Sequence, residues 1–193
     1  MILQALYDYY QRKQTDPEEA LPPFGFEWKE IPFVIEIDTS GNLVQIEDTR
    51  SVEGGKKQAR AFLVPRADRQ SSDITANLLW DNAEYALAIP RDGVSVNPWR
   101  VAEQHEAFIE RICSLPEPAA GDPGIVAVLA FLENFACRDL MHLPVWKELC
   151  TNLYLSFRLV GESELVCQRP DVKGTIERLA EKAADSKDKG ICL

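Results

Sequence analysis

With 193 residues, 46% of them hydrophobic, the chain can bury one sizeable core or two small ones. Its formal net charge of −10 excludes a general nucleic-acid coat, because non-specific phosphate binding needs a positive surface, but it allows one local basic patch. The sequence holds no apolar run long enough to span a membrane and does not open like a signal peptide, so we expect a cytoplasmic protein without a membrane partner.

The first half of the chain, residues 1–97, predicts a β-rich unit. It opens with apolar residues near helical spacing, which predict a short amphipathic helix over residues 1–14. Two alternating stretches, joined by a Gly-containing turn, then predict a β-hairpin. A polar, flexible segment is expected over residues 50–57. The strands predicted in this half cover residues 28–38, 43–49, 58–65 and 84–89.

The second half, residues 98–193, predicts helices and one further hairpin. Apolar periodicity predicts helices over residues 99–113, 125–135 and 170–184. Alternation over residues 153–159, followed by a turn at Gly161, predicts a strand that pairs with residues 165–168. We therefore expect an α+β fold in one domain, in which the β-rich half carries a basic loop and packs against the helical half.

Positive charge gathers in one short window of this acidic chain. Residues 56–69 contain five basic side chains and a single acid, Asp68. Short polar side chains of kinds that can contact a phosphate or a base edge follow at once. A plainer interpretation also stays open, in which a solvated basic strand leads through a loop to a core tryptophan, Trp80. The candidate binding residues are Lys56, Lys57, Arg60, Arg66, Arg69, Gln70, Ser71, Ser72 and Asn77.

The sequence offers no catalytic constellation. The two histidines, His105 and His142, stand apart on predicted helical or apolar segments, where histidine usually serves packing. No zinc-protease, hydrolase or P-loop motif occurs. The five cysteines are scattered and never form a C-x-x-C pair, which predicts reduced thiols rather than disulfides or a zinc site. We therefore expect a protein that is not an enzyme and holds neither a metal nor a cofactor.

Four stretches of the chain carry a resemblance to one protein family. They read MILQALYDYY, FLVPRADRQSSDITANLLWDNAEYALAI, HEAFIERI and NLYLSFRLVGESELVCQRPDVKGTIERL, in that order. Together they resemble the large subunit of the type I-C CRISPR interference complex, known as the Csd-type or Cas-eight-c family. The NLLWD block and the Arg-Gln-Ser-Ser element before it are the most specific. Because members of that family are much longer, the resemblance implies that the chain is an N-terminal fragment, truncated at its C-terminus.

The resemblance implies a non-catalytic subunit of the Cascade surveillance complex. Such a subunit recognises the protospacer-adjacent motif (PAM) in duplex DNA, supports target binding and R-loop formation, and helps to recruit a helicase–nuclease. RNA–DNA pairing supplies the sequence specificity. The implied partners are double-stranded target DNA, the CRISPR guide RNA complex, the Cascade backbone and repeat-processing subunits, the helicase–nuclease and phage anti-CRISPR proteins.

Individual roles also follow from the resemblance. Residues 69–72 and Asn77 match the family's pattern and would contact the motif, while Lys56 and Lys57 loosely match a basic, glycine-bearing loop. Trp80 and Asp81 would support the loop, and Arg158 would serve either the core or a subunit contact. Two alternatives of a different class stay open: a protein-interaction scaffold whose basic window docks an acidic partner, and a nuclease whose site carries no familiar motif.

Overall fold

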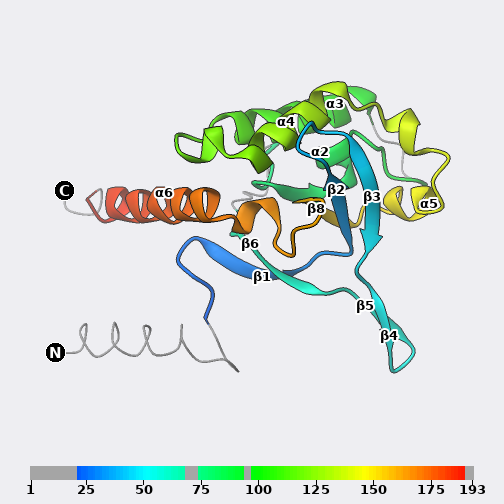
Figure 1. Ribbon diagram of the computed structural model, residues 1–193, viewed down its shortest axis with the longest axis horizontal. Helices are drawn as coiled ribbons and strands as arrows, with labels where there is room; N and C mark the ends of the chain where they lie inside the picture. The colour runs from blue at the N-terminus through cyan, green and yellow to red at the C-terminus, as the bar shows by residue number, and fades with distance from the viewer. Residues whose placement is uncertain (1–20, 68–73, 94–96, 190–193) are drawn as a thin grey trace.

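The computed structural model describes residues 21–67, 74–93 and 97–189, and it has the expected α+β fold with a β-rich first half (Figure 1). The strands are β1 (Phe26–Glu30), β2 (Phe33–Ile37), β3 (Leu43–Asp48), β4 (Ser51–Glu53), β5 (Lys56–Gln58), β6 (Ala61–Pro65), β7 (Trp80–Asn82) and β8 (Tyr154–Leu159). The α-helices are α2 (Ala83–Leu87), α3 (Pro98–Cys113), α4 (Pro123–Asn134), α5 (Trp146–Leu149) and α6 (Pro170–Lys189). Short 3-10 turns form η1 (Ala119–Gly121), η2 (Cys137–Leu140) and η3 (Val166–Gln168).

A four-stranded sheet in the order β3-β2-β8-β7 forms the centre of the molecule. The β2–β3 pair is the predicted hairpin, and β8 from the second half of the chain lies between β2 and β7. Its pairing with β2 is parallel, whereas β7 runs antiparallel to it. Both halves of the sequence therefore contribute strands to one sheet.

The two inner strands of the sheet, β2 and β8, are buried on both faces. Helices α2, α3 and α4 cover one face, where Phe157 of β8 contacts Phe108 of α3 and Phe131 of α4 (Figure 1). The β1–β6 pair and η3 lie on the other side, and the indole N–H of Trp80 donates to the Pro65 carbonyl at 2.8 Å. Double coverage explains why every residue of β2 is buried. It also explains why its sequence, FVIEI, is apolar at nearly every position.

Two of the predicted strands are divided differently in the structure. The expected strand over residues 28–38 breaks at Ile31-Pro32 into β1, which pairs with β6, and β2, which enters the central sheet. Proline has no backbone N–H to donate to a neighbouring strand, so the strand pairing changes here. The Pro32 carbonyl accepts the backbone N–H of Thr49 at 2.9 Å. The segment 50–57, expected to be flexible, forms most of the β4–β5 hairpin. As a result the expected strand 58–65 shortens to β6.

Two other predicted strands are wrong. Residues 84–89 belong largely to helix α2, whose N-cap is Asn82: its side chain accepts from the backbone N–H groups of Glu84 and Tyr85. Because both sides of this helix are buried, its apolar residues imitate a buried strand. Residues 165–168 form η3 with its N-cap, Leu165, rather than a partner for β8, whose two edges are already paired with β2 and β7.

The longer helices agree with their predictions. Helix α3 begins at Pro98 behind an Asn97 N-cap, and α4 begins at Pro123 behind an Asp122 N-cap. Helix α6 extends to Lys189, beyond the expected end. The predicted helix over residues 1–14 lies outside the described residues.

Candidate nucleic-acid interface

The β4–β5 hairpin, which we call the basic finger (residues 51–58), projects from the body of the molecule (Figure 1). Its turn is Gly54-Gly55, and both glycines have positive φ, 57° and 80°, as the turns that suit two-residue hairpins require. A Cβ atom added at either glycine would meet no other atom within 4 Å, so the tip is open. Lys56 and Lys57 follow the turn and are exposed. The finger therefore presents two adjacent positive charges to solvent.

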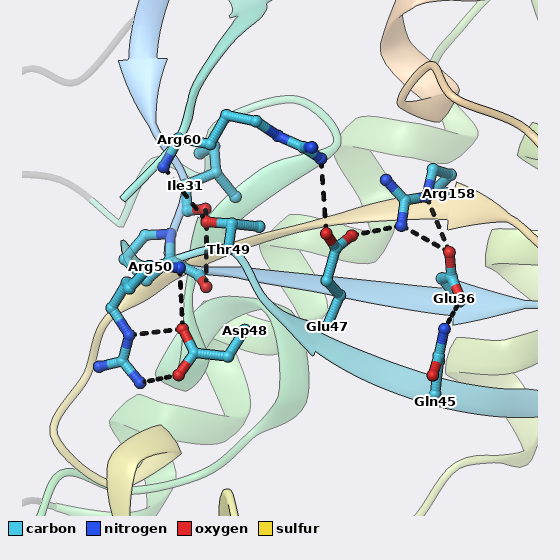
Figure 2. A network of polar contacts seen from close by, with 10 residues as sticks. Ile31, Glu36, Gln45, Glu47, Asp48, Thr49, Arg50, Arg60 and Arg158 are labelled. Carbon is cyan, nitrogen blue, oxygen red and sulfur yellow. Dashed lines mark hydrogen bonds and ion pairs between the residues drawn. The ribbon is translucent and has the colours of Figure 1, made fainter. Parts of the chain in front are cut away.

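The root of the finger is tied firmly to the body. The Arg50 guanidinium donates to Asp48 Oδ1 and Oδ2 at 2.7 and 2.5 Å (Figure 2). It also lies over the ring of Phe33, 4.7 Å from its centroid. Next to it, the Thr49 hydroxyl donates to the Ile31 carbonyl at 2.5 Å. The hydrogen bond from Arg50 lowers the pKa of Asp48 below its ordinary value. These contacts fix the direction in which the finger leaves the sheet.

Body and finger also meet through an acid of helix α5. Glu148 forms an ion pair with Arg50 through one carboxylate oxygen, and its other oxygen lies 3.7 Å from Lys57 Nζ. Sequence reasoning missed both Arg50 and Glu148 as parts of this site. They are far apart in the chain, and no local motif signals their contact.

The other two described arginines of the basic window lie away from the finger lysines. Arg60 stacks on Phe62, 4.4 Å from the ring centroid, with Nη2 3.7 Å from Glu47 Oε1. Arg66 is exposed beyond the end of β6, where its backbone N–H donates to the Gly25 carbonyl at 2.8 Å. Lys57 lies in β5, and Arg66 follows the end of β6 (Figure 1). Because a strand advances about 3.3 Å per residue, β6 separates the two side chains. The window is thus a row of charges rather than one patch.

The end of the predicted reading loop is built into the core. Asn77 is 2% exposed, and its backbone N–H donates to Asp81 Oδ2 at 2.8 Å. Its amide oxygen has no hydrogen-bond partner among the described residues. Direct contact between this side chain and DNA would require the loop to move. Four further candidates, Arg69, Gln70, Ser71 and Ser72, lie outside the described residues.

Trp80 and Asp81 support this loop, as the sequence predicted. Trp80 is 1% exposed and its ring meets Tyr154 edge-on, with centroids 5.3 Å apart. Lys29 lies over the Tyr154 ring, 4.6 Å from its centroid. Asp81 is fully buried and accepts the backbone N–H groups of Asn77 and Asn82 at 2.8 and 2.7 Å.

Arg158 belongs to the sheet, which settles the role that the sequence left open. Its Nε and Nη2 donate to Glu36 Oε1 at 3.0 and 2.5 Å, and Nη2 also contacts Glu47 (Figure 2). Burial raises the pKa of Glu36, but hydrogen bonds from Gln45 and Arg158 outweigh that effect, and the pKa is lowered. All three charged groups are satisfied within the fold, so Arg158 serves the core.

His105 and the buried cysteines that the structure describes serve packing. The His105 ring Nδ1 lies 2.8 Å from the Tyr85 carbonyl, a packing contact, and His142 is exposed. Cys150 and Cys167 are buried and take part in no disulfide among the described residues, and burial raises the pKa of Cys167. Within the described ranges, no group of three or more His, Cys, Asp or Glu side chains could hold a metal ion. In the same part of the chain, no helix has the length and apolarity needed to cross a membrane.

Comparison with known families places the chain among the CRISPR-associated proteins, which act in defence. The matching family model is that of the CRISPR-associated protein Csd1, and the match covers residues 6–193. The chain therefore belongs to the Csd1 family, whose members are components of Cascade complexes. No curated protein matches it.

Proposed function

We propose that this protein recognises the PAM in duplex DNA as a non-catalytic subunit of a type I-C surveillance complex. Membership of the Csd1 family supports the Cascade setting. The observation that carries the proposal is the basic finger, which holds Lys56 and Lys57 on an open hairpin with a fixed root. Contacts of this part of the complex with duplex DNA then support target binding, R-loop formation and recruitment of the helicase–nuclease.

The finger has a shape and charge that suit a DNA groove. A two-stranded β-ribbon fits the major groove of B-form DNA, and lysines on such a ribbon can reach backbone phosphates on either side. The chain as a whole is acidic, with a formal net charge of −10, and repels DNA away from the finger. A polyanion is therefore held at the finger and oriented by the body. Bulk neutralisation of the DNA charge then falls to partner subunits and the guide RNA complex.

Motif reading is assigned to the loop that joins β6 to β7. Arg69, Gln70, Ser71 and Ser72 are its candidate readers, because Arg and Gln side chains pair with base edges. Asn77, which is buried, would join them only after a movement of the loop that exposes its side chain. Arg60 and Arg66 would hold the backbone nearby. Buried Trp80 and Asp81 fix the end of this loop.

The test compares binding of the reconstituted complex to target duplexes with an intact or a scrambled motif. Lys56→Ala/Lys57→Ala is expected to weaken binding to both duplexes alike. The slope of the logarithm of the binding constant against the logarithm of the salt concentration should become shallower by roughly 1.8, because each phosphate that a lysine neutralises adds about 0.9 to it. Asn77→Ala is expected to reduce the preference for the intact motif if the loop moves on binding and exposes this buried side chain to the DNA. Arg100→Ala/Lys182→Ala removes two exposed charges elsewhere and serves as the matched control.

Each outcome has a clear meaning. An unchanged salt dependence in the lysine variant would show that the finger does not grip phosphate. Loss of a partner subunit from the lysine variant, with DNA binding intact in the remaining complex, would instead support the protein-interaction scaffold. Cleavage of DNA or RNA by the purified protein with a divalent metal would overturn the non-catalytic assignment.

A further inference from the structure

Glu148 is placed where it can control how strongly the basic finger holds DNA. Its carboxylate stands between two cations: one oxygen contacts Arg50 at the finger root, and the other lies 3.7 Å from Lys57 Nζ on the finger itself. Sequence patterns gave this residue no role. The structure shows it as the one ion-pair partner of Lys57 among the described residues.

The carboxylate is presented by the body of the protein rather than by the finger. Glu148 lies in α5, and the next two residues, Leu149 and Cys150, are buried in the core. The Cys150 carbonyl also accepts the backbone N–H of Asp92 at 2.9 Å. Helix α5 is therefore anchored to the core, and it presents Glu148 at the flank of the finger.

Arg50 does not depend on Glu148 for its position. It already donates two hydrogen bonds to Asp48 and stacks on Phe33. Replacing the Glu148 carboxylate by the isosteric amide therefore leaves the root in place. The negative charge of Glu148 therefore acts mainly on the Lys57 ammonium.

The Lys57–Glu148 pair adds little to the stability of the fold. The two side chains are 58% and 40% exposed, and ion pairs at this exposure contribute little because solvent screens them. For an incoming phosphate the same carboxylate matters more, because it competes for the Lys57 ammonium and repels the phosphate charge.

We propose that Glu148 is an affinity-setting residue of the DNA-binding surface, which competes with backbone phosphate for Lys57. This inference rests on the function proposed above for the finger. Glu148 keeps the sequence-independent affinity of the finger for DNA low, so that stable binding requires contacts made elsewhere. A complex that searches a genome benefits from such weakening, because non-specific sites vastly outnumber targets.

The test is Glu148→Gln in the reconstituted complex, measured on duplexes with a scrambled motif. Affinity is expected to rise about two- to fivefold, the range that exposed charge pairs support. Glu133→Gln on α4 removes one exposed carboxylate elsewhere on the molecule and controls for the change in net charge. In a Lys57→Met background, Glu148→Gln is expected to raise the affinity clearly less than in the wild type, because only its repulsion of the phosphate is then removed.

The outcomes separate this inference from the proposed function. A Glu148→Gln effect that is absent, inverted or unchanged in the Lys57→Met background would overturn competition for Lys57. If the finger lysines matter for binding but Glu148→Gln is silent, only the inference about Glu148 fails. If Lys56→Ala/Lys57→Ala is itself silent, the phosphate-binding function of the finger fails first.

Discussion

The molecule uses positive charge in two contrasting ways. Arg158 is 8% exposed, and its guanidinium is enclosed by Glu36 and Glu47 inside the sheet (Figure 2). Lys56 and Lys57 stand exposed on a finger that leaves the body (Figure 1). A buried charge that is paired with carboxylates of the fold supports the fold, whereas an exposed charge remains available to a ligand. Substitutions at the two places should therefore change different properties.

The largest effect is expected at Arg158. Arg158→Met removes the cation but leaves the buried Glu36 carboxylate without it, and breaking one side of a buried pair costs about 3 kcal/mol. Urea denaturation of the protein would measure this loss as a lower midpoint. Arg138→Ala, at a side chain 82% exposed, is the control and is expected to change the free energy of unfolding by less than about 0.5 kcal/mol. Equal stability of the two variants would refute the contrast.

A smaller effect on the free energy of unfolding is expected when acid protonates Glu36, a carboxylate of the same network. The pKa of Glu36 is lower in the folded protein than its ordinary value of 4.5, so its carboxylate stabilises the fold above that pH. This stabilisation is lost as the pH falls through the lowered pKa. The free energy of unfolding of the wild type should therefore fall more steeply below pH 4.5 than that of Glu36→Gln. Parallel curves from denaturation at each pH would show that Glu36 does not contribute.

Local signals in the sequence predicted much of the fold. Helices α3 and α4 were both expected from their apolar periodicity, and in the structure they begin behind the N-caps Asn97 and Asp122 with Pro98 and Pro123 in the first turn. The cap of α2 at Asn82 was equally visible, but complete burial gave this short helix the pattern of a strand. The parallel pairing of β8 with β2 could not be predicted, because it joins distant segments and leaves no local mark.

The candidate site also has some features that the sequence predicts and others that only the structure shows. Lys56 and Lys57 could be found because basic residues beside a Gly-Gly turn stand out in an acidic chain. The burial of Asn77 could not be read from its polar neighbours, since it depends on Asp81 accepting its backbone N–H within the core. Contacts between Glu148 and the finger likewise arise only when α5 packs beside it.

The smallest effect on stability is expected at the finger, and it completes the contrast. Lys56→Ala/Lys57→Ala removes two exposed side chains whose one described ion pair, Lys57 with Glu148, is itself largely exposed. The free energy of unfolding should therefore change by less than about 0.5 kcal/mol, while affinity for duplex DNA falls. The same urea denaturation used for Arg158→Met measures the first quantity. A loss as large as that of Arg158→Met would mean that the finger lysines support the fold, and their availability to phosphate would lose its physical basis.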